Sequence, residues 1–559
     1  MGVFLAAVAS GLAYICIHVA RDLNNATVPS FWPYALLAIA LLIALGFEFV
    51  NGFHDTANAV ATVIYTHSLP PYFAVVLSGI CNLVGVLFSS GTVAFAIITL
   101  LPVELILQVS SGAGFSMVFA LLIAAILWNL ATWWLGLPAS SSHTMVGSIL
   151  GVGLANQLLN GRNGTSGVDW DQTAKVLKAL VVSPLVGFCC AALLMLMAKG
   201  MTESLWRRLA VCMALAAGVA ALVFTFVATW WVVLLAGVAM LAASWLVAQW
   251  LTSYPAIFDA PRGQQPPPLP IRAMMVANCM GVSFAHGSND GQKGMGLIML
   301  ILIGTVPTAY ALNHAVTQHD VQSFIVASQE AGRILDGHVD ARGVLGPDAR
   351  AEVTDYIRTH QMRPDTILAL RELVEDVNHE VAHYGAYKSV PPQDQANVRN
   401  DMYVTSEALR LMEKSGNPAF TVTETKALKS YQEKLDKATK FIPDWVKVAV
   451  ALALGLGTMV GWKRVVVTVG EKIGKEHLTY AQGASAGMVA MGTIFAANLW
   501  SLPVSTTHIL SSGVAGTMTA SGSGLRLTTV RNIAAGWVFP LPAAALLSGV
   551  LYYLFHMLG

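Results

Sequence analysis

The sequence NGFHDTAN at residues 51–58 decides the fold, because a related sequence, HGSNDGQK, stands at residues 286–293. In both copies a glycine precedes an aspartate by three positions. A second pair of motifs follows, LPASSSH at residues 137–143 and LPVSTTH at residues 502–508. Two unrelated motifs that recur in the same order indicate an internal repeat. The chain is therefore expected to consist of two related halves.

The composition indicates that both halves lie in a lipid bilayer. Of the 559 residues, 55% are hydrophobic and 11% are charged, and the mean hydropathy is +0.62. An ordinary soluble domain has about 25% charged residues. Apolar runs of about 20 residues, the length that crosses a hydrocarbon core, recur along most of the chain. We predict an all-α polytopic membrane protein, and the net charge of +1 argues against a nucleic-acid partner.

Changes in composition divide the chain into units. Charged residues of both signs and helical patterning after residue 305 predict a water-exposed insert. The expected units are an N-terminal apolar segment (1–30), the first transmembrane repeat with its connecting helices (31–251), a Pro-rich linker (252–272), the start of the second repeat (273–305), a hydrophilic helical insert (306–441) and the remainder of the second repeat (442–559).

Short loops rich in Lys and Arg predict the orientation, since such loops face the cytoplasm. Placing all of them inside requires residues 115–158 and 483–518 to form helical hairpins, each returning to the side from which it came. The two halves are then inverted repeats, the arrangement of many secondary transporters, whose sites lie near the middle of the membrane. The same reasoning predicts a periplasmic insert.

Asp55 and Asp290 are the first candidate site residues. A carboxylate in a transmembrane span costs about 2.5 to 3.5 kcal/mol on an insertion scale, so each needs a partner or a function. A single aspartate could merely pair two helices through a hydroxyl or an amide, but two in repeated motifs favour a binding role. Gly52 and Gly287 allow the backbone to break, or to approach another segment closely.

The second motif has the chemistry of an anion site. Pro138 and Pro503 suit the first turn of a helix, and Ser or Thr hydroxyls follow beside free backbone amides. Helix N-termini favour phosphate through oriented N–H groups and the helix dipole. Small residues here could instead serve capping and helix packing. The duplication, with His143 or His508 after each copy, favours the anion site.

The two halves differ at positions that bear on coupling. Lys293 stands where the first copy has Asn58. We predict that it pairs with Asp290 and that its positive charge occupies the place of a bound sodium ion. His54 stands where the second copy has Asn289. Because a histidine beside Asp55 can exchange protons near neutral pH, proton coupling is the expected mode.

In these motifs the sequence resembles the inorganic phosphate transporter (Pit) family, which carries a duplicated Gly-x-Asn-Asp-x-x-Asn motif and a Pro-x-Ser-x-x-His motif. The resemblance covers about residue 31 to the C-terminus and is closest to bacterial low-affinity proton/phosphate symporters, through runs such as NGFHDTANAVATVIYT, GLPASSSHT, AHGSNDGQKGMGL, TYAQG and PVSTTH. It implies proton symport of phosphate into the cell across the inner membrane, as a neutral complex with a divalent metal such as magnesium.

The resemblance also implies roles for individual residues. Phosphate would be held by Ser140, Ser141, Ser142, Ser505, Thr506 and Thr507. The coupling cation would be served by Asp55, Asn58, Asn289 and Asp290, to which the differences between the two halves add His54 and Lys293. His54, Gln292 and Lys293 depart from the family pattern, so the family's sodium site is not expected intact. We assign the chain no cofactor and no metal site of its own.

Other functions are compatible with the same motifs. Another tetrahedral oxyanion, sulfate or arsenate, would use a similar site. A membrane-embedded enzyme acting on lipid phosphate could also use His, Asp and Ser, but a doubled set of motifs suits alternating access better than catalysis. A passive channel would conduct without a proton gradient. The sequence leaves the oligomeric state open, a homo-oligomer included.

Overall fold

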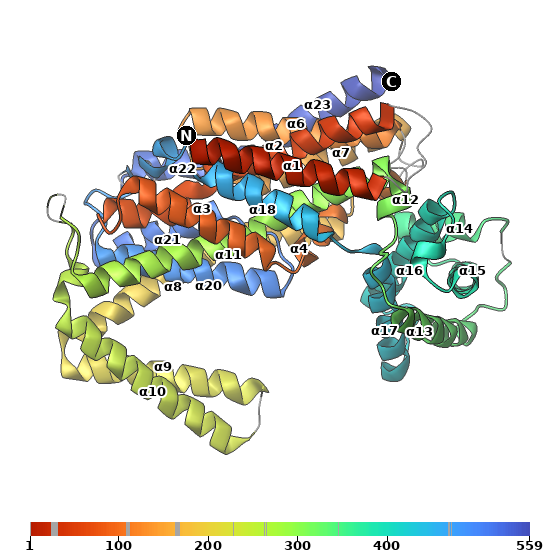
Figure 1. Cartoon of the computed structure of the whole chain (residues 1–559). Helices are drawn as coiled ribbons and strands as arrows, with labels where there is room; N and C mark the ends of the chain where they lie inside the picture. Colours follow the sequence, from red (N-terminus) through yellow and green to blue (C-terminus); the bar gives the residue numbers. More distant parts are fainter. Residues whose placement is uncertain are drawn as a thin grey trace.

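The computed structural model describes residues 2–23, 32–107, 112–161, 168–226, 229–261, 263, 265–344, 346–467, 470 and 472–558. Within them the chain is helical and contains no strand, only an isolated antiparallel bridge between Gly474 and Leu525. Figure 1 shows a bundle of long helices, with a cluster of shorter helices at one end and the hairpin α9–α10 projecting from the bundle near its other end. The predicted all-α architecture is confirmed.

The first half contains ten helices within the described residues. They are α1 (Gly2–Leu23), α2 (Trp32–Tyr65), α3 (Pro71–Leu87), α4 (Thr92–Ile98), α5 (Val103–Leu107), α6 (Gly112–Trp134), α7 (Ser141–Asn160), α8 (Trp170–Glu203), α9 (Leu205–Phe226) and α10 (Trp230–Ser253). A 3-10 turn, η1 (Pro255–Phe258), follows in the linker. Helices α3 and α4 do not form one straight span, because they meet at 77°. Gly91, with φ of 83°, precedes α4 and supplies the left-handed backbone at this bend.

The second half is interrupted by the insert. Its membrane part consists of α11 (Leu269–Thr305), α18 (Asp444–Thr458), α19 (Lys463–Val467), α20 (Tyr480–Leu499), α21 (Thr506–Ser521), α22 (Leu527–Val538) and α23 (Pro540–Leu558). The helices α6 and α7 pack together as a hairpin, and α20 and α21 form a second one. Both predicted hairpins are therefore present. Seven helices among the described residues are long and apolar enough to cross a membrane.

The glycines of the repeated motif serve close packing. Helix α2 continues through Gly52 and α11 continues through Gly287, so the alternative of a broken helix is wrong. A Cβ on Gly52 would collide with the Leu454 carbonyl of α18, and one on Gly287 would collide with the Asn82 carbonyl of α3. Glycine is needed because each of these helices passes directly against the backbone of another.

Each half packs on helices of the other. Helix α3 lies against α11, and α18 lies against α2. In the same way α7 packs on α23, while α21 packs on α8. Corresponding helices of the two halves thus make corresponding contacts with the opposite half. This arrangement brings both copies of each motif to the centre of the bundle.

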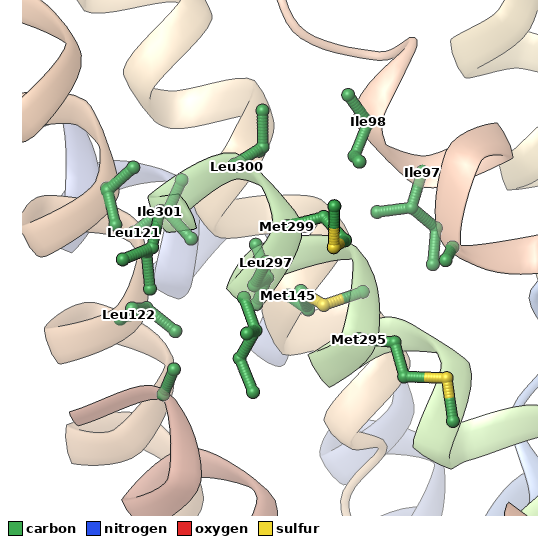
Figure 2. Close-up of a cluster of buried hydrophobic side chains, with 14 of the residues drawn as sticks. Ile97, Ile98, Leu121, Leu122, Met145, Met295, Leu297, Met299, Leu300 and Ile301 are labelled. Carbon is green, nitrogen blue, oxygen red and sulfur yellow. The ribbon is translucent and has the colours of Figure 1, made fainter. Parts of the chain in front are cut away.

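A large apolar core surrounds the second part of α11. This segment is buried on all sides, as expected for a helix that is hydrophobic all round. Figure 2 shows its side chains packed among those of α4, α6 and α7, with the labelled residues Ile97, Ile98, Leu121, Leu122, Met145, Met295, Leu297, Met299, Leu300 and Ile301.

The insert is a helical unit with a core of its own. It comprises α12 (Pro307–Tyr310), α13 (Gln318–Asp336), α14 (Ala349–Thr359), α15 (Thr366–Tyr384), the 3-10 turn η2 (Tyr387–Ser389), α16 (Gln395–Ser415) and α17 (Val422–Thr439). Its core gathers Phe324, Leu370, Val398 and Tyr431, among others. Arg399 of α16 donates to the Ile106 carbonyl of α5 at 3.4 Å, which joins the insert to the membrane part.

Glu407 of α16 is a buried acid at the junction with the membrane part. Its carboxylate lies 2.7 Å from Arg410 and 3.5 Å from Lys440. Burial raises the pKa of Glu407, but Lys440 and Arg410 outweigh burial and hold that pKa below its usual value. Arg410 also lies 3.7 Å from Asp169, the N-cap residue of α8. The ionised acid therefore helps to fix the insert in place.

Candidate functional site

The two Pro-x-Ser-x-x-His motifs form two tips of nearly identical geometry. Ser140 is the N-cap of α7 and accepts a hydrogen bond from the His143 amide at 3.2 Å. Ser505 is the N-cap of α21 and accepts one from the His508 amide, also at 3.2 Å. Their backbone angles agree as well, with φ and ψ of –102° and 118° for Ser140 and –99° and 105° for Ser505. Each tip therefore begins a helix whose first amides point inward.

The two tips touch each other. The Ser142 hydroxyl donates to the Val504 carbonyl at 2.8 Å, although 362 positions separate the two residues. The rings of His143 and His508 lie with their centroids 4.5 Å apart. All of Ser140, Ser141, Ser142, Ser505, Thr506 and Thr507 are buried. The structure thus brings the six predicted anion-binding residues to one place.

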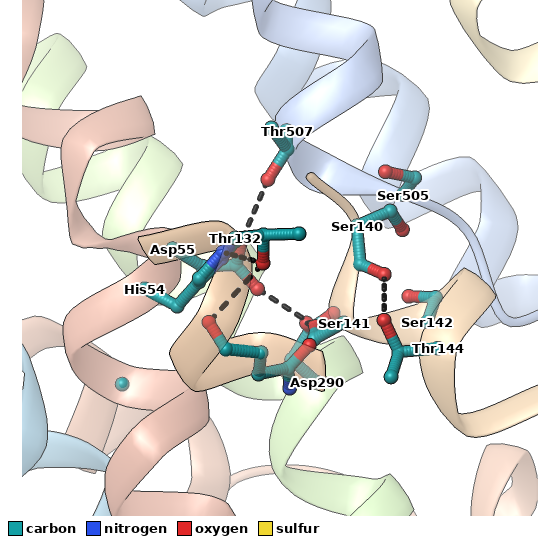
Figure 3. A network of polar contacts seen from close by, with 12 residues as sticks. His54, Asp55, Thr132, Ser140, Ser141, Ser142, Thr144, Asp290, Ser505 and Thr507 are labelled. Carbon is teal, nitrogen blue, oxygen red and sulfur yellow. Dashed lines mark hydrogen bonds and ion pairs between the residues drawn. The ribbon is translucent and has the colours of Figure 1, made fainter. Parts of the chain in front are cut away.

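Asp55 of α2 joins the two tips. The Ser141 hydroxyl donates to its Oδ2 atom at 2.8 Å, and the Thr507 hydroxyl donates to its Oδ1 atom at 2.5 Å. Figure 3 shows these two side chains reaching Asp55 from different helices. Ser141 also lies 3.4 Å from Asp290 Oδ2. Hydroxyls from both halves are therefore directed at one pair of carboxylates.

Lys293 connects the second carboxylate to the first tip. Its Nζ atom lies 2.7 Å from Asp290 Oδ1, so the predicted pair of Lys293 and Asp290 is present. The same ammonium donates to the Ser142 hydroxyl. Both charged side chains are almost completely buried, at 0% and 1% exposure. A fixed positive charge therefore stands between Asp290 and a tip hydroxyl.

The sequence matches known families over this whole region. A model described as the phosphate transporter family matches residues 51–548, which include all four motifs. The chain belongs to the phosphate transporter family. The family resemblance of the motifs is thus confirmed, and the chain is a transporter and not an enzyme.

Similar family members come from several bacteria. The low-affinity inorganic phosphate transporter PitA of Escherichia coli (strain K12) is 37% identical over 525 residues, which are 93% of this chain and 96% of PitA. PitB of the same strain is 35% identical over the same shares of the two chains. The probable low-affinity inorganic phosphate transporter of Bacillus subtilis (strain 168) is 23% identical over 94% of this chain and 99% of its own.

A solved structure shares the fold. The structure titled "The sodium-dependent phosphate transporter" aligns with a TM-score of 0.53 and 18% identity over 94% of this chain and 100% of that one. The chain has bacterial relatives in this family and several apolar helices that are long enough to cross a membrane. It is therefore a multi-pass protein of the bacterial inner membrane.

The predicted coupling residues of this transporter are only partly gathered. His54 lies beside the cluster, with Nδ1 3.6 Å from Asp55 Oδ1 and Nε2 3.1 Å from the Thr132 hydroxyl. Asn289 turns away from the carboxylates and donates to Asn498 Oδ1 at 2.6 Å. Helix α2 includes Asn58, but its side chain lies outside the described residues.

His286, a buried residue of α11, lies in the site although it is not among the residues predicted from the sequence. Its Nε2 atom lies 3.5 Å from Asp290 Oδ2 and 3.8 Å from Asp55 Oδ2. The available signal was its spacing of four residues from Asp290, which places both side chains on one helix face. Its counterpart in the first motif, Asn51, is neutral, so the two copies differ in charge at this position as well.

Glu48 of α2 was missed as well. It is completely buried and packs against Gly294 of α11, close to the Lys293–Asp290 pair. Neither of its carboxylate oxygens makes a hydrogen bond with the described residues. Among the described residues, the site therefore holds three buried acids, Asp55, Asp290 and Glu48, and three side chains that can carry a positive charge, Lys293, His286 and His54, in addition to the hydroxyls of both tips.

Proposed function

We propose that the chain imports inorganic phosphate by proton symport, with phosphate held between the two tips. The observation that carries this proposal is the convergence of the Ser141 and Thr507 hydroxyls, from two repeated motifs, on the Asp55 carboxylate. Hydroxyl donors directed at anionic oxygens are the chemistry that a phosphate oxygen also needs. The names of the bacterial relatives and of the family support phosphate as the substrate.

The roles of the tip residues follow from their present partners. Ser140 and Ser505 cap the helices, so they support the site by fixing the first amides of α7 and α21. Ser141, Ser142, Thr506 and Thr507 provide hydroxyl donors beside those amides. Oriented N–H groups at two helix ends, together with these hydroxyls, supply enough donors for the oxygens of a tetrahedral anion.

The buried charges explain why a cation must accompany phosphate. Asp55 and Asp290 repel an approaching anion, and Lys293 balances only one of them. A further positive charge at this cluster therefore favours anion binding, and anion binding favours the positive charge to the same extent. That reciprocity is the basis of symport. A proton suits the cluster because histidine can carry it near neutral pH.

Two further features belong to the proposal. Phosphate travels as a neutral complex with a divalent metal such as magnesium, which enters as part of the substrate and reduces the charge that crosses the membrane. The two repeats are inverted, as the placement of the Lys- and Arg-rich loops on one side of the membrane indicates. The insert is then periplasmic. A cysteine introduced at the exposed Val344 should react with an impermeant thiol reagent in intact spheroplasts.

Uptake of labelled phosphate into proteoliposomes tests the function. Proton and sodium gradients are imposed separately, each with and without magnesium, and protein-free liposomes give the background. We expect accumulation with an inward proton gradient and no response to sodium. Accumulation driven only by sodium, or a flux without dependence on the proton gradient, would contradict the proposal. Sulfate as competitor distinguishes phosphate from the other oxyanions.

A further inference from the structure

The environment of His286 determines which of its ring nitrogens carries hydrogen. Nδ1 lies 2.8 Å from the Oδ1 atom of Asn82 on α3. The Asn82 amide in turn donates to the Thr458 hydroxyl at 3.0 Å. That hydroxyl has one hydrogen, which it donates to the Leu454 carbonyl of its own helix at 2.9 Å. Thr458 therefore accepts from Asn82, and the Asn82 oxygen faces the histidine.

This chain of hydrogen bonds makes Nδ1 a donor. In a neutral imidazole the other nitrogen, Nε2, then has a lone pair and no hydrogen. Yet Nε2 is directed at the carboxylates of Asp290 and Asp55, 3.5 and 3.8 Å away. A lone pair facing two buried carboxylates is repelled by both. A hydrogen on Nε2 turns the same arrangement into an attraction, so the geometry favours a proton at this point.

The charges that face His286 support the same conclusion. Helix α2 contributes Asp55, His54 and Glu48, and α11 contributes Asp290 and Lys293. The neighbouring helices α3 and α20 contain no charged residue. With Asp55 and Asp290 ionised, Lys293 protonated and Glu48 in its neutral, protonated form, one proton on His286 brings these five groups to zero net charge. Lys293 already supplies the other positive charge and disfavours a metal ion in the same place.

We propose that the transported proton binds to Nε2 of His286, between Asp55 and Asp290, and that Asn82 is the positioning residue that makes this proton necessary. The inference rests on the proposed proton symport and names the group that carries it out. A proton from the outer water forms the N–H bond, and phosphate then binds to a cluster of lower negative charge. On the inner side the N–H bond breaks, the proton goes to water, and the restored negative charge favours release of phosphate.

Variants at Asn82 test the inference without removing the histidine. In Asn82→Ala the imidazole can move its hydrogen to Nε2 while staying neutral, so protonation becomes less favourable. In Asn82→Asp an anionic acceptor faces Nδ1, so protonation becomes more favourable. We expect the pH midpoint of phosphate uptake to move to lower pH in the first and to higher pH in the second. The expected size is about one pH unit each way, as for one hydrogen bond to an ionised group.

The controls separate coupling from folding. Ser78→Ala removes the 2.8 Å bond between Ser78 of α3 and Ser283 of α11, one turn from Asn82, and should leave the midpoint unchanged. His286→Gln should reduce the number of protons carried per phosphate, measured with a pH dye inside proteoliposomes, whatever rate remains. Monodisperse elution in detergent shows which variants are folded.

The outcomes separate this inference from the proposed function. If wild-type protein moves phosphate without protons, the proposed symport fails. If wild-type protein couples the two but both Asn82 variants keep its midpoint, the inference is overturned. It is also overturned if His286→Gln carries as many protons per phosphate as the wild type.

Discussion

Lys293 and Asp290 form a buried ion pair whose removal should affect the membrane part strongly. Nζ and Oδ1 are 2.7 Å apart, and the side chains are 0% and 1% exposed. Lys293→Met leaves Asp290 as an uncompensated buried charge, which typically costs about 3 to 5 kcal/mol. Asp290→Asn leaves Lys293 in the same condition. The double variant removes both charges, so its loss should be smaller than the sum of the single losses by at least about 2 kcal/mol.

Denaturant unfolding in detergent, followed by tryptophan fluorescence, measures these free energies. The signal reports on the membrane part alone, because none of the tryptophans lies in residues 306–441. The exposed pair of Arg342 and Asp340 in the insert is the control, and Arg342→Met should leave this transition unchanged. Single variants as stable as the wild type, or losses that simply add, would refute the reasoning.

The same lysine bears on ion selectivity. Lys293→Asn introduces the neutral oxygen ligand that the first half has at Asn58. It also removes the ammonium group beside Asp290, so that a sodium ion can bind there. We expect phosphate uptake by this variant to become stimulated by sodium, measured with imposed sodium gradients in proteoliposomes. Uptake that stays sodium-independent and fully active would count against the role assigned to Lys293.

Three further predictions concern packing, the tips and the insert. Gly52→Ala should lower the unfolding free energy by more than about 2 kcal/mol, because the added Cβ collides with the backbone of α18. Gly46→Ala on the same helix is the control, since no atom lies within 4 Å of its added Cβ. Equal losses in the two variants would contradict the packing argument. Thr507→Val should raise the KM of phosphate uptake about tenfold or more, because the hydroxyl that faces Asp55 is lost. Thr517→Val is the control and should leave KM unchanged, because the Thr517 hydroxyl donates within its own helix. An unchanged KM in both variants would show that Thr507 is not part of the site. The lowered pKa of Glu407 means that the ionised acid stabilises the insert fully above its ordinary pKa of 4.5. This stabilisation is lost as pH falls through the lower pKa that Glu407 has in the folded protein. The protection of α16 amides against hydrogen exchange, relative to the intrinsic rate at each pH, should therefore fall at acidic pH in the wild type. It should change less in Glu407→Gln, and identical pH profiles of protection would contradict this.

Features encoded by local spacing could be predicted from the sequence. The hairpin tips follow from a proline and a run of hydroxyl residues before a helix, and their duplication indicated that they act together. The Lys293–Asp290 pair lies three residues apart on one helix, so its formation did not depend on the rest of the fold. The insert was recognised because its charge content differs from that of the membrane spans.

Features that depend on helix rotation and packing could not be predicted. His286 and Glu48 face the carboxylate cluster only because α11 packs against α2 and α3 at this rotation. Asn289 has the residue type of an ion ligand, but the end of α20 offers Asn498 as a closer partner. The glycines were compatible with a broken or a continuous helix, and the close neighbouring backbones decided between them.

The position of the bound anion tests the central claim most directly. A structure of the protein with arsenate, located by its anomalous scattering, would reveal which groups hold the tetrahedral anion. We predict a single arsenic position within hydrogen-bonding reach of both tips, next to Ser141 and Thr507 and on the same side as Asp55. An ordered arsenate bound by only one tip, or far from both, would contradict the account.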